Sequence, residues 1–389
     1  MLLFMSSEPP PFRVMIVGIV GAGQLARMTL PVAESLAIDI KLLAERDDDS
    51  AALVGKHVDL GSPQSLNDLR QFAIGCDVVT FDHELVNADA LKTLQDEGHV
   101  IRPSADVVAL VQDKLAQREL MRSLDLPIPA FEVVNGASTI ETFSAAHGWP
   151  LVAKTIRGGY DGRGVWVLRD AQEAHQLLDN VGASSGILFE EWIPIDREVA
   201  SIVARRPNGE MAVYPLVETV QIDGICHELR APAGENDGMV NAAREIAKTI
   251  AKAIRLEGLL AVELFVSGGR LIVNELAARP HNSGHFTIEG CRTSQFAQHV
   301  RAVLDLPLGD INLTAPAVAT VNVLGGSEPV DPRSRLSAAL GVSGCTPHLY
   351  GKGYRPGRKL GHVTAIGEDP DETMARARHA AKLLVSSEE

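Results

Sequence analysis

Residues 158–166, "GGYDGRGVW", place four glycines within seven positions, between two predicted strands at 151–156 and 165–168. Glycine loses more conformational freedom on folding than any other residue, so such a cluster usually serves a close backbone approach or a moving loop. A glycine loop between two strands can cover phosphate groups with its backbone N–H groups, as in protein kinases. Lys154 lies on the preceding strand, where its ammonium could meet a phosphate. The loop alone leaves open the alternative of a surface hairpin with a solvated lysine.

Two carboxylates stand in otherwise apolar strands, Glu263 in "LLAVELFV" and Glu275 in "LIVNELA". An unpaired buried charge costs several kcal/mol, so buried acids on paired strands usually share a cation. With a three-residue loop at 268–270, Glu263 lies opposite Glu275; with a two-residue turn it faces Asn274 instead. Either register gathers two carboxylates and an amide oxygen, which suits octahedral Mg²⁺ with ATP phosphates completing the shell. Surface acids on an edge hairpin are the alternative.

Two further segments have the composition of ligand contacts. In "EEWIPIDRE" a strand ends at an acid and passes Trp192 and Ile193, so its backbone could meet an adenine edge while Glu198 takes ribose hydroxyls. From Lys352 to Lys359 there are four basic residues and no acid, which fits capture of a phosphate ester. An ordinary strand end and a solvated basic loop are the respective alternatives.

The elements that must position these residues follow a clear order. "FRVMIVGIV", "IDIKLLAE" and "CDVVTFDHEL" are typical of buried parallel strands, and "GAGQLARM" of a glycine turn into a helix. Pro103-Ser104 predicts a helix start. Strands at "EVASIVARR" and "EMAVYPLVETV" form an antiparallel pair around "PNG", and the spacing of apolar residues predicts a helix over 238–255. We expect an α/β unit, a mixed α+β middle and a small C-terminal unit.

Bulk composition narrows the class of protein. The 389 residues are 46% hydrophobic and 22% charged, as in soluble globular enzymes, and the net charge of −14 argues against nucleic-acid or membrane-surface partners. Four scattered cysteines form no C-x-x-C pair, which predicts neither disulfides nor a zinc site. No apolar stretch reaches the length of a membrane span, and the short apolar start lacks a basic flank. These features predict a cytoplasmic protein.

Together these motifs resemble the ATP-grasp superfamily, and within it the N5-carboxyaminoimidazole ribonucleotide synthetase family. The resemblance extends over nearly the whole chain and is carried by "GAGQLARM", "VVTFDHE", "GGYDGRG", "EEWIPIDRE", "NELAARPHNSGH", "HLYGK" and "RPGRKLGH". It implies an N-terminal Rossmann-like (pre-ATP-grasp) domain at 1–112, an ATP-grasp domain at 113–310 with a lid subdomain at about 133–200, and a small C-terminal domain at 311–389. Relatives are typically dimers, so a homodimer is expected.

The resemblance also implies an activity in purine biosynthesis. ATP would phosphorylate bicarbonate to carboxyphosphate, and 5-aminoimidazole ribonucleotide would be carboxylated to N5-carboxyaminoimidazole ribonucleotide. Unstable carboxyphosphate would benefit from a closing glycine lid that excludes water. The cofactors implied are ATP and Mg²⁺, with Mn²⁺ able to replace it, and neither NAD nor zinc.

Roles for single residues follow from the same resemblance. Tyr160 and Asp161 would face the aminoimidazole, while Arg279 and His281 would hold bicarbonate and its phosphorylated form; with Lys352 these form the expected catalytic set. The expected ATP contacts are Lys114, Lys154, Gly159, Tyr160, Asp161, Gly162, Arg163, Gly164, Glu190, Glu191, Trp192, Ile193, Glu198, Gln221, Asn274 and Glu275. The expected metal ligands are Glu263 and Glu275. The expected ribonucleotide contacts are Gly23, Gln24, Leu25, Glu84, Tyr160, Asp161, Arg163, Asn282, Lys352, Arg358 and Lys359.

The chain departs from the family pattern at two positions. Gln221 and Leu85 stand where relatives often carry histidines, which puts the nucleotide contact of Gln221 and the substrate contact of the neighbouring Glu84 in question.

Several other functions compete with this interpretation. "GIVGAGQLA" fits G-x-G-x-x-A with Glu45 after the next strand, as in an NAD-dependent oxidoreductase, but that function leaves the acidic hairpin and the glycine loop unexplained. Glycinamide ribonucleotide transformylase and biotin carboxylase are other ATP-grasp ligases, against which "YDGRG" and the basic tail weigh. A non-catalytic nucleotide-binding module would not need both carboxylates and both lysines.

Overall fold

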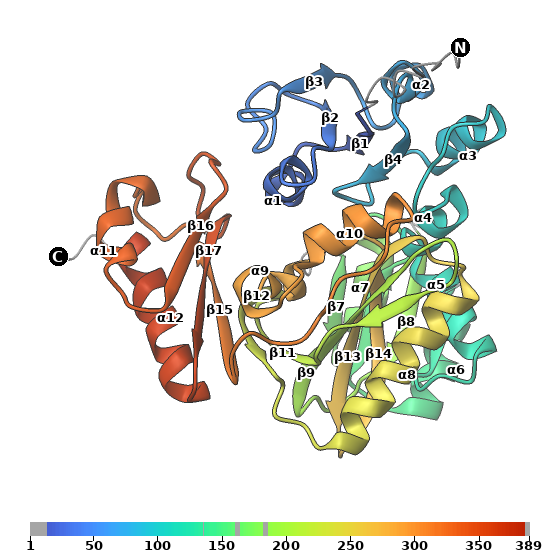
Figure 1. Ribbon diagram of the computed structural model, residues 1–389. Helices are drawn as coiled ribbons and strands as arrows, with labels where there is room; N and C mark the ends of the chain where they lie inside the picture. The colour runs from blue at the N-terminus through green and yellow to red at the C-terminus, as the bar shows by residue number, and fades with distance from the viewer. Residues whose placement is uncertain (1–13, 135, 160–163, 182–185, 386–389) are drawn as a thin grey trace, which may run out of the picture.

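The computed structural model describes residues 14–134, 136–159, 164–181 and 186–385, and three sheets organise these residues (Figure 1). One sheet is parallel and belongs to the N-terminal part; the other two are antiparallel. The predicted combination of an α/β unit with an α+β unit is therefore confirmed.

The parallel sheet has the strand order β3-β2-β1-β4. Its strands are β1 (Ile16–Val20), β2 (Asp39–Ala44), β3 (His57–Leu60) and β4 (Val78–Phe81), and its helices are α1 (Gln24–Glu34), α2 (Leu66–Ala73) and α3 (Ala88–Asp96). β4 is buried throughout and β1 nearly so, as the apolar runs predicted. The sequence did not indicate β3, because its four side chains are partly or fully exposed at the sheet edge.

The large antiparallel sheet runs in the order β14-β13-β9-β11-β12-β15-β17-β16, with β10 paired to β9. Its strands are β9 (Arg197–Arg205), β10 (Met211–Val213), β11 (Val217–Ile222), β12 (Ile225–Ala231), β13 (Gly258–Ser267), β14 (Arg270–Ala277), β15 (Ala317–Leu324), β16 (Cys345–Leu349) and β17 (Lys359–Gly367). The predicted pairing around "PNG" is confirmed, since Met211 lies opposite Arg205. The C-terminal strands extend this sheet through the pairing of β12 with β15.

Helices cover the large sheet and join it to the other parts. They are α4 (Ala105–Val111), α5 (Lys114–Ser123), α8 (Asp237–Ala253), α9 (Thr287–Gly290), α10 (Gln295–Val303), α11 (Leu336–Leu340) and α12 (Pro370–Val385). Ser104 caps α4, as Pro103-Ser104 predicted, and α8 confirms the helix predicted over 238–255. α10 lies between the large sheet and the N-terminal part, with Val300 and Val303 in a shared core (Figure 1).

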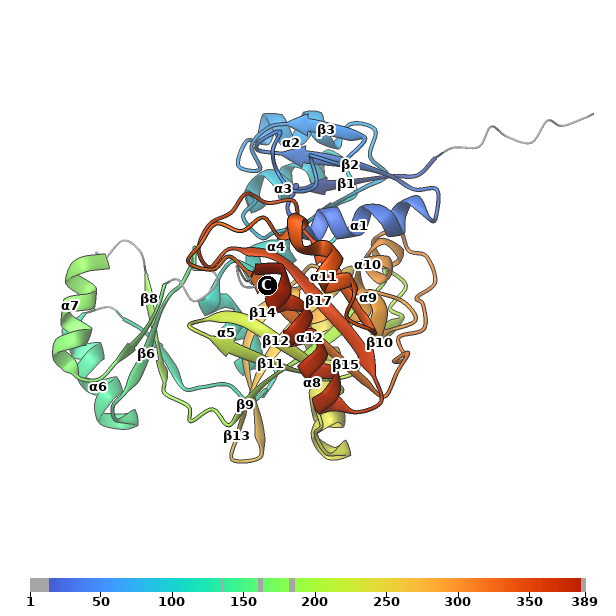
Figure 2. The ribbon, with the colours of Figure 1, turned by 90° about the vertical axis from the view of Figure 1, so that its left-hand side faces the viewer.

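The third sheet is small and stands apart from the rest in Figure 2. Its strands, in the order β5-β8-β6-β7, are β5 (Phe131–Val133), β6 (Leu151–Thr155), β7 (Val165–Leu168) and β8 (Ile187–Glu191), and its helices are α6 (Ala137–His147) and α7 (Ala171–Val181). It has a core of its own, centred on Ile140, Leu151 and Phe189. This sheet carries the strands on both sides of the glycine cluster.

Among the described helices, none combines the length and the apolar character that crossing a membrane would need.

Histidine side chains make contacts between elements that lie far apart in the sequence. The rings of His285 and His348 both stack on His362, with centroids 4.8 and 4.6 Å away. His299 of α10 meets the hydroxyl of Thr80 on β4 at 2.8 Å. Burial lowers the pKa of His285, His299 and His362, to about 3 for His299.

These histidines predict acid sensitivity of the fold. They stay neutral when folded, whereas the unfolded chain takes up their protons below a pKa of about 6.5. The unfolded state therefore binds more protons as the pH falls through that value, and each histidine removes up to about 1.4 kcal/mol of stability per pH unit. The urea midpoint should fall steeply between pH 7.5 and pH 5. His299→Gln should make that slope shallower, and a midpoint independent of pH would contradict the expectation.

Candidate functional site

The hairpin of β13 and β14 brings the two predicted metal ligands together. Ser267 pairs with Arg270 around a two-residue turn, in which Gly268 and Gly269 have φ of 53° and 73°. Positive φ at both central residues is what a tight hairpin turn requires. This turn alone would place Glu263 opposite Asn274, yet the register shifts beside Glu263 and pairs it with Glu275.

That β-bulge decides which oxygens face the site. Asn274 is the extra residue of the bulge, and its side chain contacts one of the two carboxylates: its Nδ2 lies 3.4 Å from Glu263 Oε2. Burial, together with the charges of Glu275 and Glu198, raises the pKa of Glu263 to about 7. A carboxylate so disfavoured as an anion is stabilised by a nearby cation.

This donor set fits Mg²⁺. Magnesium takes one or two carboxylates and completes its octahedron with water and substrate phosphates, and the hairpin offers two carboxylates and one amide. Within the described part of the chain, no group of three or more His, Cys, Asp or Glu is placed so that it could hold a metal such as zinc.

Both predicted lysines reach this hairpin. Asp113 caps α5, so Lys114 begins the helix, and its Nζ lies 2.5 Å from Glu275 Oε1. Lys154 of β6 is buried; its Nζ lies 2.8 Å from Glu190 Oε2 and 3.2 Å from Asn274 Oδ1. Burial lowers the pKa of Lys154, although Glu190 opposes that shift.

The carboxylate of Glu190 has two partners that the sequence did not predict. Its carboxylate is buried between Lys154 and Arg118, whose Nε lies 2.6 Å from Oε1. Burial alone would raise the pKa of Glu190, but the two cations outweigh it and hold the pKa at about 2. The side chain therefore serves as the counter-ion of Arg118 and Lys154.

The other residues predicted to contact the nucleotide differ in their surroundings. Glu191 accepts a hydrogen bond from the Ala130 N–H at 3.0 Å, and its other carboxylate oxygen lies 3.6 Å from His147 Nδ1. Trp192 is half-exposed, and burial raises the pKa of Glu198, whose charge also acts on Glu263. Gln221 lies at a bulge of β11.

The glycine cluster is described only at its edges. Gly164 has φ of 76°, and a Cβ there would lie 2.5 Å from Thr155 Oγ1, so glycine is needed where the segment rejoins β7. Gly159 lies beyond the end of β6. Tyr160, Asp161, Gly162 and Arg163 fall outside the described residues.

A cleft of about 410 Å³ adjoins the hairpin and draws on all three parts of the chain. Its lining residues are Gly23, Gln24, Leu25, Asp82, His83, Ile225, Arg279, His281, Asn282, Lys352, Arg355, Gly357, Arg358 and Lys359. The cleft thus brings together seven of the predicted ribonucleotide contacts: Gly23, Gln24, Leu25, Asn282, Lys352, Arg358 and Lys359. Five basic side chains against the single carboxylate of Asp82 make the cleft suited to an anion, despite the negative net charge of the chain.

The predicted bicarbonate residues lie where the cleft meets the hairpin. Arg279 Nε lies 2.6 Å from Glu84 Oε2, and His281 Nε2 lies 3.5 Å from Glu263 Oε1. Burial and the charges of Arg279 and Lys359 lower the pKa of His281 to about 3, so its ring is neutral at pH 7. Glu84 is not among the residues that line the cleft, but it pairs with Arg279, which is.

Several residues at the candidate site were not predicted from the sequence. Gln295, which is fully buried, accepts a hydrogen bond from the His281 N–H at 2.9 Å and donates to its carbonyl at 2.7 Å. Gly284 leaves room for it, since a Cβ there would lie 2.3 Å from the Gln295 amide. Arg118, His83 and Arg355 also lie at the two sites. Gln295 and Arg118 belong to none of the motifs quoted above; His83 lies in "VVTFDHE" and Arg355 in "RPGRKLGH", but neither was predicted as a contact.

The turn before α1 bears on the dehydrogenase alternative. Asp82 Oδ2 accepts a hydrogen bond from the Gly23 N–H at 2.5 Å, and a Cβ at Gly21 would lie 2.0 Å from Asp82 Oδ1. In dinucleotide-binding folds the pyrophosphate sits at this helix N-terminus. A carboxylate there repels a pyrophosphate, which argues against NAD at this turn.

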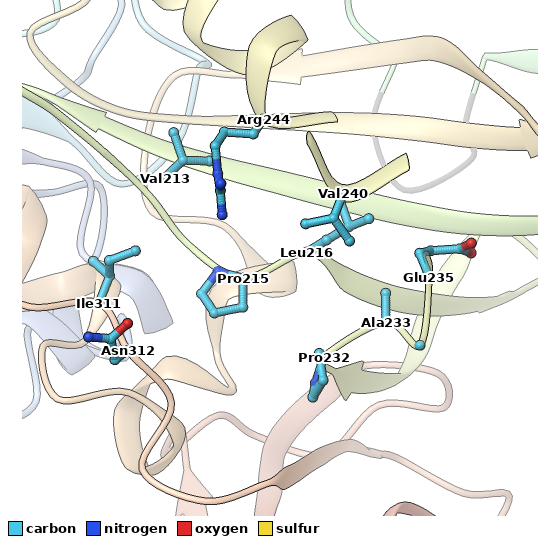
Figure 3. Close-up of a pocket in the computed structure, with 11 residues that line it drawn as sticks. Val213, Pro215, Leu216, Pro232, Ala233, Glu235, Val240, Arg244, Ile311 and Asn312 are labelled. Atoms are coloured by element: carbon cyan, nitrogen blue, oxygen red, sulfur yellow. The ribbon is translucent and has the colours of Figure 1, made fainter. Parts of the chain in front are cut away.

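A second cavity of about 240 Å³ lies away from these residues (Figure 3). It is lined by Val213, Pro215, Leu216, Pro232, Ala233, Gly234, Glu235, Val240, Arg244, Ile311 and Asn312. None of the predicted site residues lines it, so we place the functional site at the hairpin and its adjoining cleft.

Three family models match consecutive parts of the chain. They are the ribonucleotide synthetase preATP-grasp domain at residues 14–112, the ATP-grasp domain at 119–296 and the phosphoribosylaminoimidazole carboxylase C-terminal domain at 318–376. Together they span all three parts that line the cleft.

Known proteins resemble the chain over nearly its whole length. The N5-carboxyaminoimidazole ribonucleotide synthase of Mycobacterium tuberculosis is 42% identical, over 99% of this chain and 92% of the relative. The crystal structure of the N5-carboxyaminoimidazole ribonucleotide synthetase from Thermus thermophilus is 35% identical, with a TM-score of 0.86 over 96% of this chain and 99% of that chain. The Aspergillus clavatus enzyme, solved in complex with ADP and 5-aminoimidazole ribonucleotide, is 31% identical, with a TM-score of 0.88 over 95% and 98%.

Proposed function

The chain belongs to the family of N5-carboxyaminoimidazole ribonucleotide synthases, and we propose that its hairpin holds Mg·ATP while the adjoining cleft holds the ribonucleotide. It is an ATP-dependent ligase that carboxylates 5-aminoimidazole ribonucleotide to N5-carboxyaminoimidazole ribonucleotide in purine biosynthesis. The observation that carries the assignment of sites is that the cleft rich in basic side chains meets the acidic hairpin at Arg279 and His281.

At the proposed ATP site, the side chains position the nucleotide and neutralise its charge. Lys114 and Lys154 would hold the nucleotide phosphates, and Glu263 and Glu275, with Asn274, would hold Mg²⁺. The metal would neutralise phosphate charge as it develops. Because Lys154 is buried and fixed by two partners, it loses little side-chain freedom on binding ATP.

The chemical steps are proposed at the junction of the two sites. A bicarbonate oxygen attacks the γ-phosphorus, ADP leaves, and carboxyphosphate forms. Carboxyphosphate either breaks down to CO₂ and phosphate, after which the exocyclic amine attacks CO₂, or the amine attacks the carboxyphosphate carbon directly and displaces phosphate. In both routes the amine loses a proton as the new C–N bond forms. Arg279 would neutralise the bicarbonate anion, and neutral His281 would accept or donate a hydrogen bond to it. Tyr160 and Asp161 would face the aminoimidazole.

The ribonucleotide's phosphate is proposed to lie against the 352–359 segment. Lys352 contacts Gln24 Oε1 and lies 5.8 Å from the centre of the Tyr350 ring, so it connects this segment to the glycine turn. Asn282 offers a buried Nδ2 that has no hydrogen-bond partner among the described residues, which suits a polar ligand group.

Lys352→Ala should raise the KM for the ribonucleotide and leave the KM for ATP nearly unchanged. A hydrogen bond to a charged group contributes about 1.5–3 kcal/mol, which corresponds to a rise of about 10- to 100-fold. Steady-state kinetics with each substrate varied in turn measures both constants. Lys382→Ala, an exposed site on α12, is the control. Equal changes in both KM values would contradict the assignment of Lys352 to the subsite for the ribonucleotide's phosphate.

The function is tested by ADP formation with bicarbonate, measured with and without 5-aminoimidazole ribonucleotide. We expect ADP formation to depend on bicarbonate and the product N5-carboxyaminoimidazole ribonucleotide to appear only with the ribonucleotide. ADP formation that depends on glycinamide ribonucleotide with formate, or on biotin with bicarbonate, would favour a different ATP-grasp ligase.

We also propose a cytoplasmic homodimer, supported by the family resemblance and by four scattered free cysteines. The proposed division of the chain keeps its boundaries at 112/113 and 310/311, with the lid subdomain at about 133–200. Analytical ultracentrifugation measures the oligomeric state.

A further inference from the structure

Arg118 makes two directional contacts from one buried guanidinium. Its Nε lies 2.6 Å from Glu190 Oε1, and its Nη1 donates to the Asn274 carbonyl at 2.7 Å. Its side chain is only 3% exposed. Glu190 lies on β8 of the small sheet and Asn274 on the bulge of β14 in the large sheet, so a single side chain joins the two walls of the ATP site.

The same two partners hold Lys154. Its Nζ lies 2.8 Å from Glu190 Oε2 and 3.2 Å from Asn274 Oδ1. Arg118, Glu190, Lys154 and Asn274 therefore form a closed ring of contacts, in which each oxygen of Glu190 has its own cation. Removing Arg118 would leave one oxygen of Glu190 unpaired and free Glu190 to turn, and Lys154 would lose its fixed position.

The backbone that carries Arg118 is anchored next to it. Gln117 Oε1 accepts a hydrogen bond from the Leu276 N–H at 3.0 Å, and its Nε2 donates to the Val111 carbonyl at 3.0 Å. α5 is thus held against β14 independently of Arg118, so a change of the Arg118 side chain need not displace the helix.

We propose that Arg118 is a positioning residue of the ATP site, which fixes Lys154 for the nucleotide phosphates and sets the spacing between β8 and the β14 bulge. The proposal rests on the proposed function in taking ATP as the nucleotide. Arginine is required because its planar fork donates in two directions at once, whereas lysine offers one ammonium on a flexible stem.

The test compares Arg118→Lys and Arg118→Met with the same changes at Arg122. Arg122 lies one turn further along α5, is 60% exposed and pairs with Glu119 at 3.0 Å. Calorimetry measures Mg·ATP binding by the full chain, and steady-state kinetics gives the KM for ATP and for the ribonucleotide. We expect Arg118→Lys to raise the Kd and KM for ATP at least tenfold, to leave the KM for the ribonucleotide unchanged, and to melt near the wild-type temperature. Arg122→Lys should match the wild type.

A purely structural role would lower the amount of active enzyme and leave both KM values unchanged, which would overturn the proposal. Wild-type ATP binding by Arg118→Lys would overturn it as well. Combining Arg118→Lys with Glu190→Gln should cost less than the sum of the single changes, because both act through Lys154; additive losses would contradict this. Calorimetry needs no turnover, so it tests Arg118 even if the wild type fails to carboxylate the ribonucleotide, a failure that would count against the proposed function instead.

Discussion

Replacing Glu275 with glutamine will lower Mg·ATP turnover by a factor on the order of 10²–10³, the range seen when one preorganised charge-stabilising group is removed. The substitution keeps the size of the side chain and the pairing of β13 with β14, but it removes one of the two carboxylates proposed to bind Mg²⁺. It also removes the partner of Lys114. ADP release over a range of Mg²⁺ concentrations measures the effect.

Two controls separate the role of the metal from that of the lysine. Glu257→Gln removes a carboxylate that pairs with Arg102 just before β13, and it should leave turnover unchanged. Lys114→Met should weaken ATP binding without changing the Mg²⁺ concentration needed for half-maximal rate, whereas Glu275→Gln should raise that concentration. ADP release by Glu275→Gln at the wild-type rate would contradict the proposal that Glu275 binds Mg²⁺.

Arg279→Ala is expected to lower kcat by roughly 10²–10³, because it removes the cation proposed to neutralise bicarbonate and its phosphorylated form. The effect should appear in bicarbonate-dependent ADP formation, with a KM for ATP close to that of the wild type. Arg279 lies 2.6 Å from Glu84, so the variant also leaves that carboxylate without its ion pair.

Glu84→Gln distinguishes these two causes. It removes the same ion pair but keeps the guanidinium, and Gln112 still holds the backbone of Glu84 through a hydrogen bond of 2.6 Å to its carbonyl. A much smaller loss for Glu84→Gln than for Arg279→Ala would assign the effect to the cation itself. Equal losses would mean that the ion pair, rather than bicarbonate binding, explains the sensitivity of Arg279.

The pairing of the metal carboxylates shows how far local patterns reach. Glu263 and Glu275 were predictable as partners because both interrupt apolar strands. The sequence allowed two registers, one for a two-residue turn and one for a three-residue loop. The turn has two residues, but the pairing of Glu263 with Glu275 is the one expected for the three-residue loop. A bulge arises from packing and hydrogen bonding between whole strands, so no pattern around Asn274 indicates it.

Residues that act from outside the motifs were harder to predict. Arg118 follows Lys114 by four positions, and in the sequence this spacing is equally typical of two solvated cations on one helix face. Its burial depends on β8 and β14, where its partners Glu190 and Asn274 lie 72 and 156 residues away in the sequence. Glu190 was predicted within a segment whose backbone contacts adenine, but nothing in the sequence indicated that two buried cations on other elements determine the direction of its side chain.

The continuity of the large sheet from β12 into β15 has a consequence for dissecting the enzyme. A shortened protein that stops before residue 317 would bare the full edge of β12, whose N–H and C=O groups from Glu228 to Ala231 now pair with β15. Unprotected edges of this kind recruit strands from other molecules. The nucleotide-binding half is therefore not a separable module, and its truncated form should self-associate instead of remaining a soluble ATP binder.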